Sequence, residues 1–216
     1  MIVDERMITF INSLDTKNSE ILEDIEREAL ADNVPIIRRE MQSFLKVLLM
    51  VKKPMRVLEV GTAVGFSALL MSEYVPEECA ITTIENYEKR IPIARQNFVR
   101  AGKEKKITLL EGDAMDVLKT LEGPYDFIFM DAAKGQYIYY MPEVIRLLEH
   151  GGVLVSDNVL QEGDIIESRF AVERRNRTIH SRMREYLYEL KHHKLLETSI
   201  IPLGDGVALS TKIREE

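Results

Sequence analysis

The spacing of hydrophobic residues changes part-way along this chain. Between residues 36 and 51, apolar residues recur every three or four positions, which predicts an amphipathic helix. From Arg56 onward, short apolar runs alternate with helical patterns, as is typical of a mostly parallel sheet with helices on both faces. The sequence therefore predicts an α/β fold, with a helical cap over residues 1–52 and a Rossmann-like core over residues 53–216.

Seven short apolar runs predict the strands of this sheet. They are Val57–Val60, Ala80–Ile84, Ile107–Leu110, Phe127–Met130, Val153–Ser156, Thr198–Pro202 and Gly206–Lys212. Helices are expected between the first five strands, at about Phe66–Glu73, Glu88–Ala101, Ala114–Leu121 and Tyr137–Leu148. The residues from Leu203 to Gly206 predict a hairpin turn, so the last strand should be antiparallel. No repeat or linker interrupts the pattern, and a single domain is expected.

Composition narrows the class of protein. The 216 residues are 45% hydrophobic, which is ordinary for a folded domain. No apolar run has the length of a membrane span, the first residues lack a signal-peptide pattern, and Cys79 is the only cysteine. These features lead us to expect a cytoplasmic protein. The net charge of −7 argues against a general nucleic-acid binder, although the segment from Ser168 to Lys194 has eight Lys or Arg and three Glu.

A glycine turn after the first strand predicts a nucleotide-type ligand. The stretch Val57–Ser67 places Gly61 and Gly65 between a strand and a helix. Ligands of such sheets bind at the carboxyl ends of the strands. Glu85 follows the second strand and can accept hydrogen bonds from ribose hydroxyls, and Asp113 follows the third strand, where it can meet an adenine amino group. Helix capping is the alternative role for both carboxylates.

Two adenosine cofactors fit this geometry, a dinucleotide and S-adenosylmethionine. Residues 59–65 have the pattern Glu-x-Gly-x-x-x-Gly, which lacks the closely spaced glycines that approach a pyrophosphate. S-adenosylmethionine has no phosphate, so the pattern favours it. A nicotinamide-dependent oxidoreductase on the same fold remains the alternative.

Hard oxygen ligands follow the fourth and fifth strands. Asp131 ends the fourth strand, and Asp157 and Asn158 end the fifth. If the two strands are neighbours, these side chains converge on a set that suits Mg²⁺ better than zinc. Lys134 lies three residues after Asp131. A nearby cation would favour its neutral form, so Lys134 is a candidate general base.

These residues stand in motifs that resemble the cation-dependent O-methyltransferases, the family of the catechol and caffeoyl-CoA enzymes. The similarity covers nearly the whole chain. It is carried by Glu59–Ser67, Glu85, Gly112–Ala114, Asp131–Lys134, Ser156–Val159 and Pro202–Gly206. The resemblance implies a methyltransferase, a homodimer, and Mg²⁺ bound by Asp131, Asp157 and Asn158, with Lys134 as the base. It also implies that S-adenosylmethionine is bound by Met41, Gly61, Gly65, Ser67, Glu85, Asp113, Ala114 and Asp131, and that Asp131 is catalytic together with Lys134.

Within this family, Asp131–Tyr137, Asp157–Leu160 and the arginines near residue 175 are most similar to bacterial tRNA 5-hydroxyuridine methyltransferases. This similarity implies methylation of a wobble 5-hydroxyuridine in tRNA to 5-methoxyuridine. The expected RNA patch consists of Arg38, Arg174, Arg175 and Arg177. Ala132 and Ala133 are small where catechol enzymes carry bulky aromatics, which favours a wider mouth.

Two questions about function stay open at this point. The acceptor is either tRNA or, as the alternative, a small catechol or phenol. The basic stretch is either an RNA-binding surface or a solvated helix face that includes glutamates.

Overall fold

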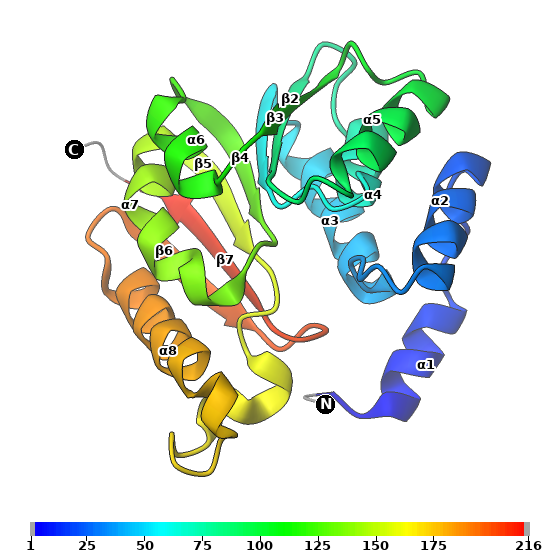
Figure 1. The fold of residues 1–216 in the computed structure, drawn as a ribbon. Helices are drawn as coiled ribbons and strands as arrows, with labels where there is room; N and C mark the ends of the chain where they lie inside the picture. Colours follow the sequence, from blue (N-terminus) through cyan, green and yellow to red (C-terminus); the bar gives the residue numbers. More distant parts are fainter. Residues whose placement is uncertain (1–2, 214–216) are drawn as a thin grey trace. The chain divides into compact units, whose positions relative to one another are not determined.

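The computed structural model of this chain describes residues 3–213, so the outer ends of the predicted cap and core lie outside the described residues. Its seven strands follow the order β3-β2-β1-β4-β5-β7-β6 in one mixed sheet (Figure 1). The predicted Rossmann-like α/β fold with N-terminal helices is therefore confirmed. The chain divides into two compact units, one over residues 6–117 and the other mainly from residue 118 onward. The predicted boundary at residue 52 falls inside the first unit.

The first unit contains the N-terminal helices and three parallel strands. Its helices are α1 (Glu5–Ser13), α2 (Glu20–Ala31), α3 (Arg39–Lys52), α4 (Phe66–Tyr74) and α5 (Ile91–Arg100). Its strands are β1 (Arg56–Val60), β2 (Ala80–Glu85) and β3 (Ile107–Glu111), with Val60 opposite Ile84 and Glu85 opposite Glu111. The carboxyl ends of the three strands are therefore level with one another.

Helix packing in this unit follows the predicted amphipathic pattern. Helix α3 buries Met41, Leu45 and Leu49 along one face, as its three-to-four-residue spacing requires. Helices α2 and α3 both contact α4, and α4 contacts β2. Helix α5 begins at Ile91, later than expected, with a proline in its first turn, where the missing N–H has no intrahelical partner to lose.

The second unit contains the C-terminal strands. Its elements are β4 (Tyr125–Met130), η1 (Lys134–Gln136), α7 (Tyr137–Leu147), β5 (Leu148–Ser156), η2 (Gln161–Ile166), η3 (Arg174–Asn176), α8 (Arg177–His192), β6 (Leu196–Ile201) and β7 (Val207–Lys212). Strands β4 and β5 are parallel, whereas β7 is antiparallel to both β5 and β6. The predicted antiparallel last strand and the hairpin before it are thus confirmed. Helix α8 packs against α7 and β6. Helix α6 (Ala114–Thr120) spans the division between the units.

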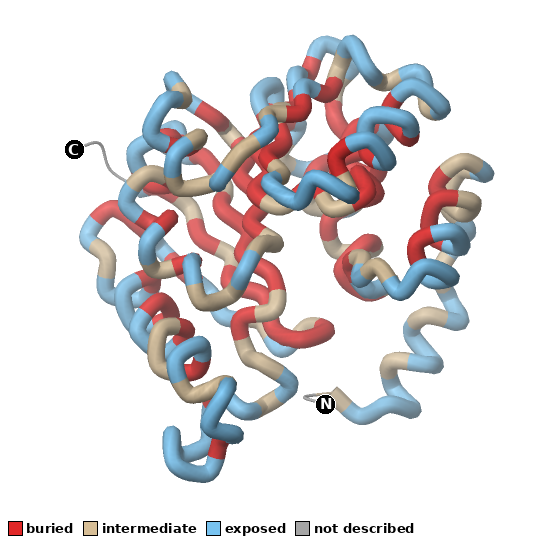
Figure 2. The backbone as a smooth tube through the Cα atoms, viewed as in Figure 1, coloured by how far each residue is buried: buried red, intermediate tan, exposed pale blue. Residues whose placement is uncertain are grey.

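The core lies along the strands and the helix faces that cover them. Buried residues follow β4, β5 and β7, while the outer faces of the helices are exposed (Figure 2). Helix α1 differs, because none of its residues is buried. Among the described helices, none has the length and apolar character that crossing a membrane requires.

Candidate functional site

The glycine turn after β1 has the strained backbone for which glycine is suited. Gly61 has a φ of 106° and Gly65 a φ of 85°, both in the region that favours glycine. The N–H groups of Gly61 and Thr62 both donate to the carbonyl of Ile84, at 3.1 Å, which fixes the turn to the end of β2. A Cβ on Gly65 would lie 2.5 Å from the Phe98 ring. Glycine is therefore required at residue 65 by both conformation and packing.

Glu85 is held by backbone amides at the end of β2. One of its carboxylate oxygens accepts the N–H of Ala63 at 2.7 Å, and the other accepts those of Asn86 and Tyr87 at 3.0 and 2.9 Å. The side chain is half-buried, so free lone pairs remain for an incoming ligand. Its contact with Ala63 places the carboxylate beside the glycine turn, as a ribose-binding residue requires.

The remaining predicted cofactor residues, apart from Asp131, belong to the same unit. Asp113 is exposed, and its carboxylate accepts the N–H of Met115 at 2.9 Å. The capping role considered for Asp113 is therefore present, and it leaves the other carboxylate oxygen available. Ala114 opens α6, Ser67 is buried in the first turn of α4, and Met41 is buried on α3.

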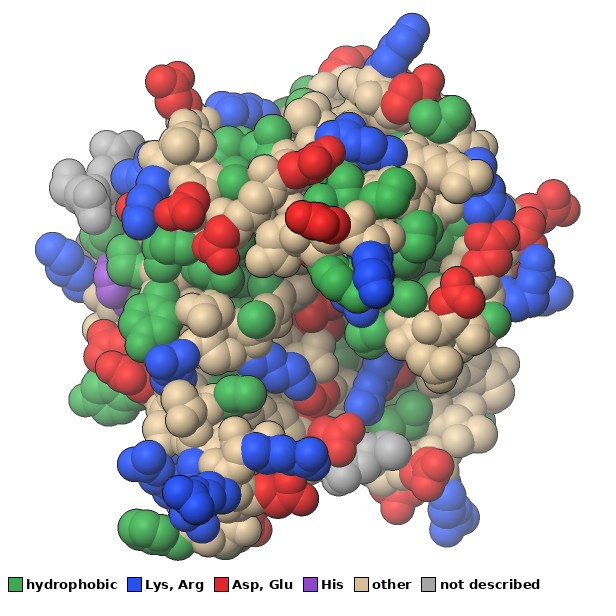
Figure 3. Space-filling view, viewed as in Figure 1, with side chains coloured by type: hydrophobic (Ala, Val, Ile, Leu, Met, Phe, Trp, Pro, Cys, Tyr) green, Lys and Arg blue, Asp and Glu red, His purple; other side chains and the backbone are tan. Residues whose placement is uncertain are grey.

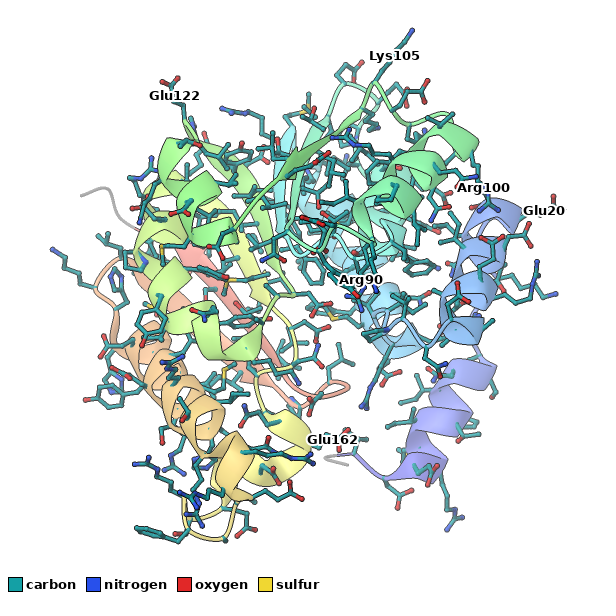
Figure 4. All side chains as sticks on the ribbon, viewed as in Figure 1. Glu20, Arg90, Arg100, Lys105, Glu122 and Glu162 are labelled. Atoms are coloured by element: carbon teal, nitrogen blue, oxygen red, sulfur yellow. The ribbon has the colours of Figure 1, made fainter. Side chains whose placement is uncertain are left out.

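Polar side chains of α5 form hydrogen bonds that hold the backbone of the glycine turn. The buried side-chain amide of Asn97 donates to the carbonyl of Val64 at 2.9 Å. Arg100, which extends from α5 toward α2 in Figure 4, donates to the Asn97 side-chain oxygen and to both carboxylate oxygens of Glu28. These contacts connect the helical N-terminal region to the turn. The sequence analysis did not single out Asn97, whose only signal was a polar residue on an apolar helix face.

Two carboxylates stand at the ends of neighbouring strands in the second unit. Strands β4 and β5 pair in parallel with Met130 opposite Ser156, so Asp131 and Asp157 follow at the same level. The N–H of Asp157 donates to the carbonyl of Met130 at 3.0 Å. The neighbouring-strand condition for the predicted ligand set is therefore met.

Both carboxyl groups titrate far above their usual range. Burial raises the pKa of Asp131 to about 6, although the nearby Lys134 acts against this shift. Burial also raises the pKa of Asp157 to about 7, with further contributions from the negative charges of Asp131 and Asp205. Such an arrangement of negative charge in a partly buried site is one that a cation would stabilise.

Asn158 occupies a position that suits its residue type. Its φ of 61° is left-handed, a conformation that asparagine adopts more readily than most residues. Its side-chain N–H donates to Asp131 at 3.5 Å, and its backbone N–H donates to Asp157 at 2.7 Å. To bind a cation the amide would have to turn over, so that its oxygen faces the carboxylates.

Lys134 has a partner that the sequence analysis missed. Its Nζ donates to the carboxylate of Asp205 at 3.1 Å, and Asp205 is buried in the hairpin before β7. The prediction treated this aspartate only as part of a turn. Because β7 runs antiparallel to β5, its first residues lie at the edge where β4 and β5 end. An acidic residue between two glycines at the start of the last strand was the available signal.

The hairpin also holds the loop that follows Asn158. The N–H groups of Val159 and Leu160 donate to the carbonyls of Gly206 and Asp205, and the N–H of Glu162 donates to the Asp205 carboxylate. Glu162 is labelled in Figure 4. Asp205 therefore joins Lys134 to the loop after β5.

The donor set fits a hard divalent cation. Within the described residues there is no group of three or more His, Cys, Asp and Glu side chains that could hold a metal. The predicted set differs from such a group because it has two carboxylates, Asp131 and Asp157, and one amide, Asn158. All three offer oxygen ligands when the Asn158 amide is turned. Such a set leaves positions for water and substrate oxygens on Mg²⁺ or Mn²⁺.

The predicted RNA patch is only partly available to a ligand. Lys and Arg side chains gather around the start of α8, at the lower left of Figure 3. Arg174 and Arg175 are exposed, and Arg175 pairs with Glu173 at 2.7 Å. Arg177 instead donates to the carbonyls of Val172 and Phe170. Two other arginines of α8 also donate to backbone carbonyls: Arg182 to that of Gly135 and Arg184 to that of Ile165. Arg38 is exposed at the start of α3, in the other unit.

Comparison with known proteins identifies the type of enzyme. A family profile described as O-methyltransferase matches residues 12–213. Caffeoyl-CoA O-methyltransferase 2 of Populus trichocarpa is 32% identical over 79% of this chain and 72% of its own length. A catechol O-methyltransferase of Mycobacterium tuberculosis is 38% identical over 51% of each chain. The S-adenosylhomocysteine-bound methyltransferase PaMTH1 of Podospora anserina has a TM-score of 0.88 at 25% identity and covers 96% of this chain and 94% of its own.

Proposed function

The chain belongs to this family of S-adenosylmethionine-dependent O-methyltransferases, and we propose that it methylates one of two oxygens on adjacent carbons of a small aromatic ring. The observation that carries this proposal is the pair of aspartates at the ends of β4 and β5 beside a lysine and an amide. Vicinal oxygens match a cation held by such a set. The names of the plant and mycobacterial relatives support a catechol or a caffeoyl-type acceptor.

The proposed methyl donor lies at the glycine turn. Glu85, already oriented by three backbone amides, would accept the ribose hydroxyls, and Asp113 would accept the adenine amino group. Gly61 and Gly65 would allow the backbone to approach the cofactor closely. Met41, Ser67 and Ala114 are proposed as the remaining contacts.

In the proposed reaction, Lys134 takes the proton of the acceptor hydroxyl at its Nζ. When bound, S-adenosylmethionine would supply the methyl group. An oxygen–carbon bond would form as its sulfur–carbon bond breaks, with the bonding pair going to sulfur and S-adenosylhomocysteine leaving. The charge that forms on Lys134 lies 3.1 Å from the Asp205 carboxylate, which stabilises it. Much of the rate gain should come from holding oxygen and methyl in line.

A divalent cation is the second proposed cofactor. Asp131, Asp157 and Asn158 would hold it. When bound, it would supply a positive charge that lowers the pKa of the acceptor hydroxyl and orients the vicinal oxygens.

Methyl transfer to catechol-type acceptors tests this proposal. Wild-type protein with Mg²⁺ and S-adenosylmethionine should give a monomethylated product by mass spectrometry. Chelation with EDTA or the Asp131→Ala substitution should abolish the transfer, while S-adenosylmethionine binding measured by calorimetry persists in the wild type with EDTA. Undiminished turnover after all divalent cations are removed would exclude the metal role.

A tRNA acceptor is the second candidate, because 5-hydroxyuridine also carries two oxygens on adjacent ring carbons. The exposed Arg174 and Arg175 favour it, together with the excess of basic residues between Ser168 and Lys194. The use of Arg177 in contacts with the backbone carbonyls of Val172 and Phe170 reduces the surface available for phosphate contacts. The relatives reported above support the small acceptor better.

Two measurements separate these acceptors. If tRNA is the substrate, cells that lack this gene should accumulate 5-hydroxyuridine and lose 5-methoxyuridine in nucleoside mass spectrometry. Arg174→Glu combined with Arg175→Glu should then reduce tRNA methylation and leave catechol methylation intact. Equal loss on both acceptors would count against an RNA patch.

A homodimer completes the proposed assembly. Helix α1 carries three exposed apolar residues at helical spacing, Met7, Phe10 and Ile11, and the exposed Leu14 directly follows its last residue. A nine-residue helix is marginal in water without packing against another surface. A second copy of the chain is the proposed cover for this face.

A further inference from the structure

A single buried hydroxyl joins the ends of the two strands that carry the proposed cation ligands. Tyr137, the first residue of α7, is completely buried, and its ring packs edge-on against Tyr186 with centroids 5.5 Å apart. Its oxygen lies 3.1 Å from the carbonyl oxygen of Met130 and 3.2 Å from that of Asp157. It also accepts the backbone N–H of Ala132 at 3.2 Å.

The three backbone groups around this hydroxyl flank both proposed ligands. Met130 and Ala132 are the chain neighbours of Asp131, and the third group is the carbonyl of Asp157 itself. The hydroxyl has one proton, so it donates to one carbonyl at a time while its oxygen accepts from Ala132. Together with the bond from the Asp157 N–H to the Met130 carbonyl, it fixes the backbone on which both carboxylates stand.

We propose that Tyr137 is a positioning residue for the divalent cation, because its hydroxyl sets the spacing of Asp131 and Asp157 before the cation binds. This inference rests on the proposed function, since it takes the two aspartates as ligands. Groups that orient metal ligands commonly change metal affinity by ten- to a hundredfold. The backbone contacts of Tyr137 give it that position without contact with the cation.

Tyr137→Phe removes the hydroxyl and keeps the ring, and Tyr186→Phe is the matched control. Tyr186 is also completely buried, and its hydroxyl forms one hydrogen bond, at 2.6 Å, with the side chain of Ser156. Both variants lose one buried hydroxyl from the same aromatic pair. The hydroxyl of Tyr186, however, bonds a side chain, whereas that of Tyr137 bonds backbone groups on both sides of Asp131.

The measurement is calorimetric titration of Mn²⁺ into the metal-free full chain, with thermal melting in parallel. Tyr137→Phe should raise the Kd for Mn²⁺ about tenfold, whereas Tyr186→Phe should stay within about twofold of wild type. Both should melt at similar temperatures and bind S-adenosylmethionine with wild-type affinity. An unchanged Mn²⁺ Kd in Tyr137→Phe, or equal weakening in both variants, would overturn the positioning role.

Replacement of Tyr137 by 4-aminophenylalanine provides the rescue, because its amine keeps a donor for the two carbonyls. Its Mn²⁺ Kd should return to within about threefold of wild type. A Kd as weak as that of Tyr137→Phe would contradict the inference. If Tyr137→Phe does not fold, the 4-aminophenylalanine variant alone is compared with wild type by the same threefold criterion. Failure of the wild type to bind Mn²⁺ would overturn the proposed cation site itself, which is a different result from unaltered binding in the variant.

Discussion

At the scale of single residues, Asp131 and Asp157 make the stability of the metal-free protein depend on pH. Their folded-state pKa values, about 6 and about 7, lie above the ordinary value near 4 of an unfolded aspartate. Folding therefore takes up protons between about pH 4 and about pH 7. The contribution of these two carboxyl groups to stability is complete below about pH 4 and is lost as the pH rises through 6 and 7.

Asp157→Asn should remove much of this pH dependence. Asparagine keeps an acceptor for the N–H of Asn158 and carries no charge. At pH 8 in a chelator, the free energy of unfolding should exceed that of wild type by about 4 kcal/mol at most, because the pKa of Asp157 is raised from near 4 to about 7 in the folded chain. The difference should be smaller at pH 5 and should disappear only below about pH 4. Urea unfolding between pH 5 and 8 measures this difference.

Asp116→Asn is the control for this measurement, since Asp116 is an exposed aspartate on α6. It should leave the wild-type pH profile unchanged. Wild-type stability that stays flat or rises between pH 5 and 8 would contradict the expected direction. Saturating Mg²⁺ should restore stability to the wild type at pH 8, because the cation binds the ionised carboxylates.

At the scale of elements, the hairpin between β6 and β7 holds the loop that follows β5. Asp205→Ala should remove the acceptor of the Glu162 N–H and increase amide exchange at that residue, while Leu160 keeps its backbone bond to residue 205. Asp205→Asn keeps that acceptor, so its loop should stay protected. Both variants lose the charge that faces Lys134 and should have a lower kcat for methyl transfer.

Hydrogen exchange by mass spectrometry, together with turnover, separates these two roles of Asp205. A protected Glu162 amide in Asp205→Ala would show that the carboxylate does not hold the loop. A wild-type kcat in Asp205→Asn would show that its charge does not assist Lys134.

The elements also show how far the sequence can predict this molecule. The strands that precede Asp131 and Asp157 were predicted because a buried parallel strand is a continuous apolar run that ends at a polar residue. Strand β5 begins at Leu148, earlier than predicted. The hydrophobic pattern did not indicate these first residues, because residues 149–151 are polar or glycine and exposed.

Asp205 and Tyr137 could not be assigned from local patterns. The role of Asp205 depends on β7 pairing with β5, a contact between residues more than 50 positions apart. The role of Tyr137 depends on three backbone groups that meet only when β4 and β5 lie side by side. Local periodicity gives the edge where the ligands stand, whereas the groups that orient them come from long-range pairing.

At the scale of the whole molecule, the exposed face of α1 leads to a prediction about assembly. Met7 is 55% exposed and Phe10 is 59% exposed, and the face has the spacing of a helix that packs on another surface. The wild-type chain of 24.9 kDa should therefore elute with twice that mass in light-scattering chromatography. Phe10→Glu combined with Ile11→Glu should shift the protein to the mass of one chain, because two charges would be buried at the contact. Val99→Glu, at an exposed apolar residue of α5, should leave the dimer intact. A wild-type mass of one chain at micromolar concentration would exclude the proposed dimer, and equal loss of the dimer in both variants would place the contact elsewhere.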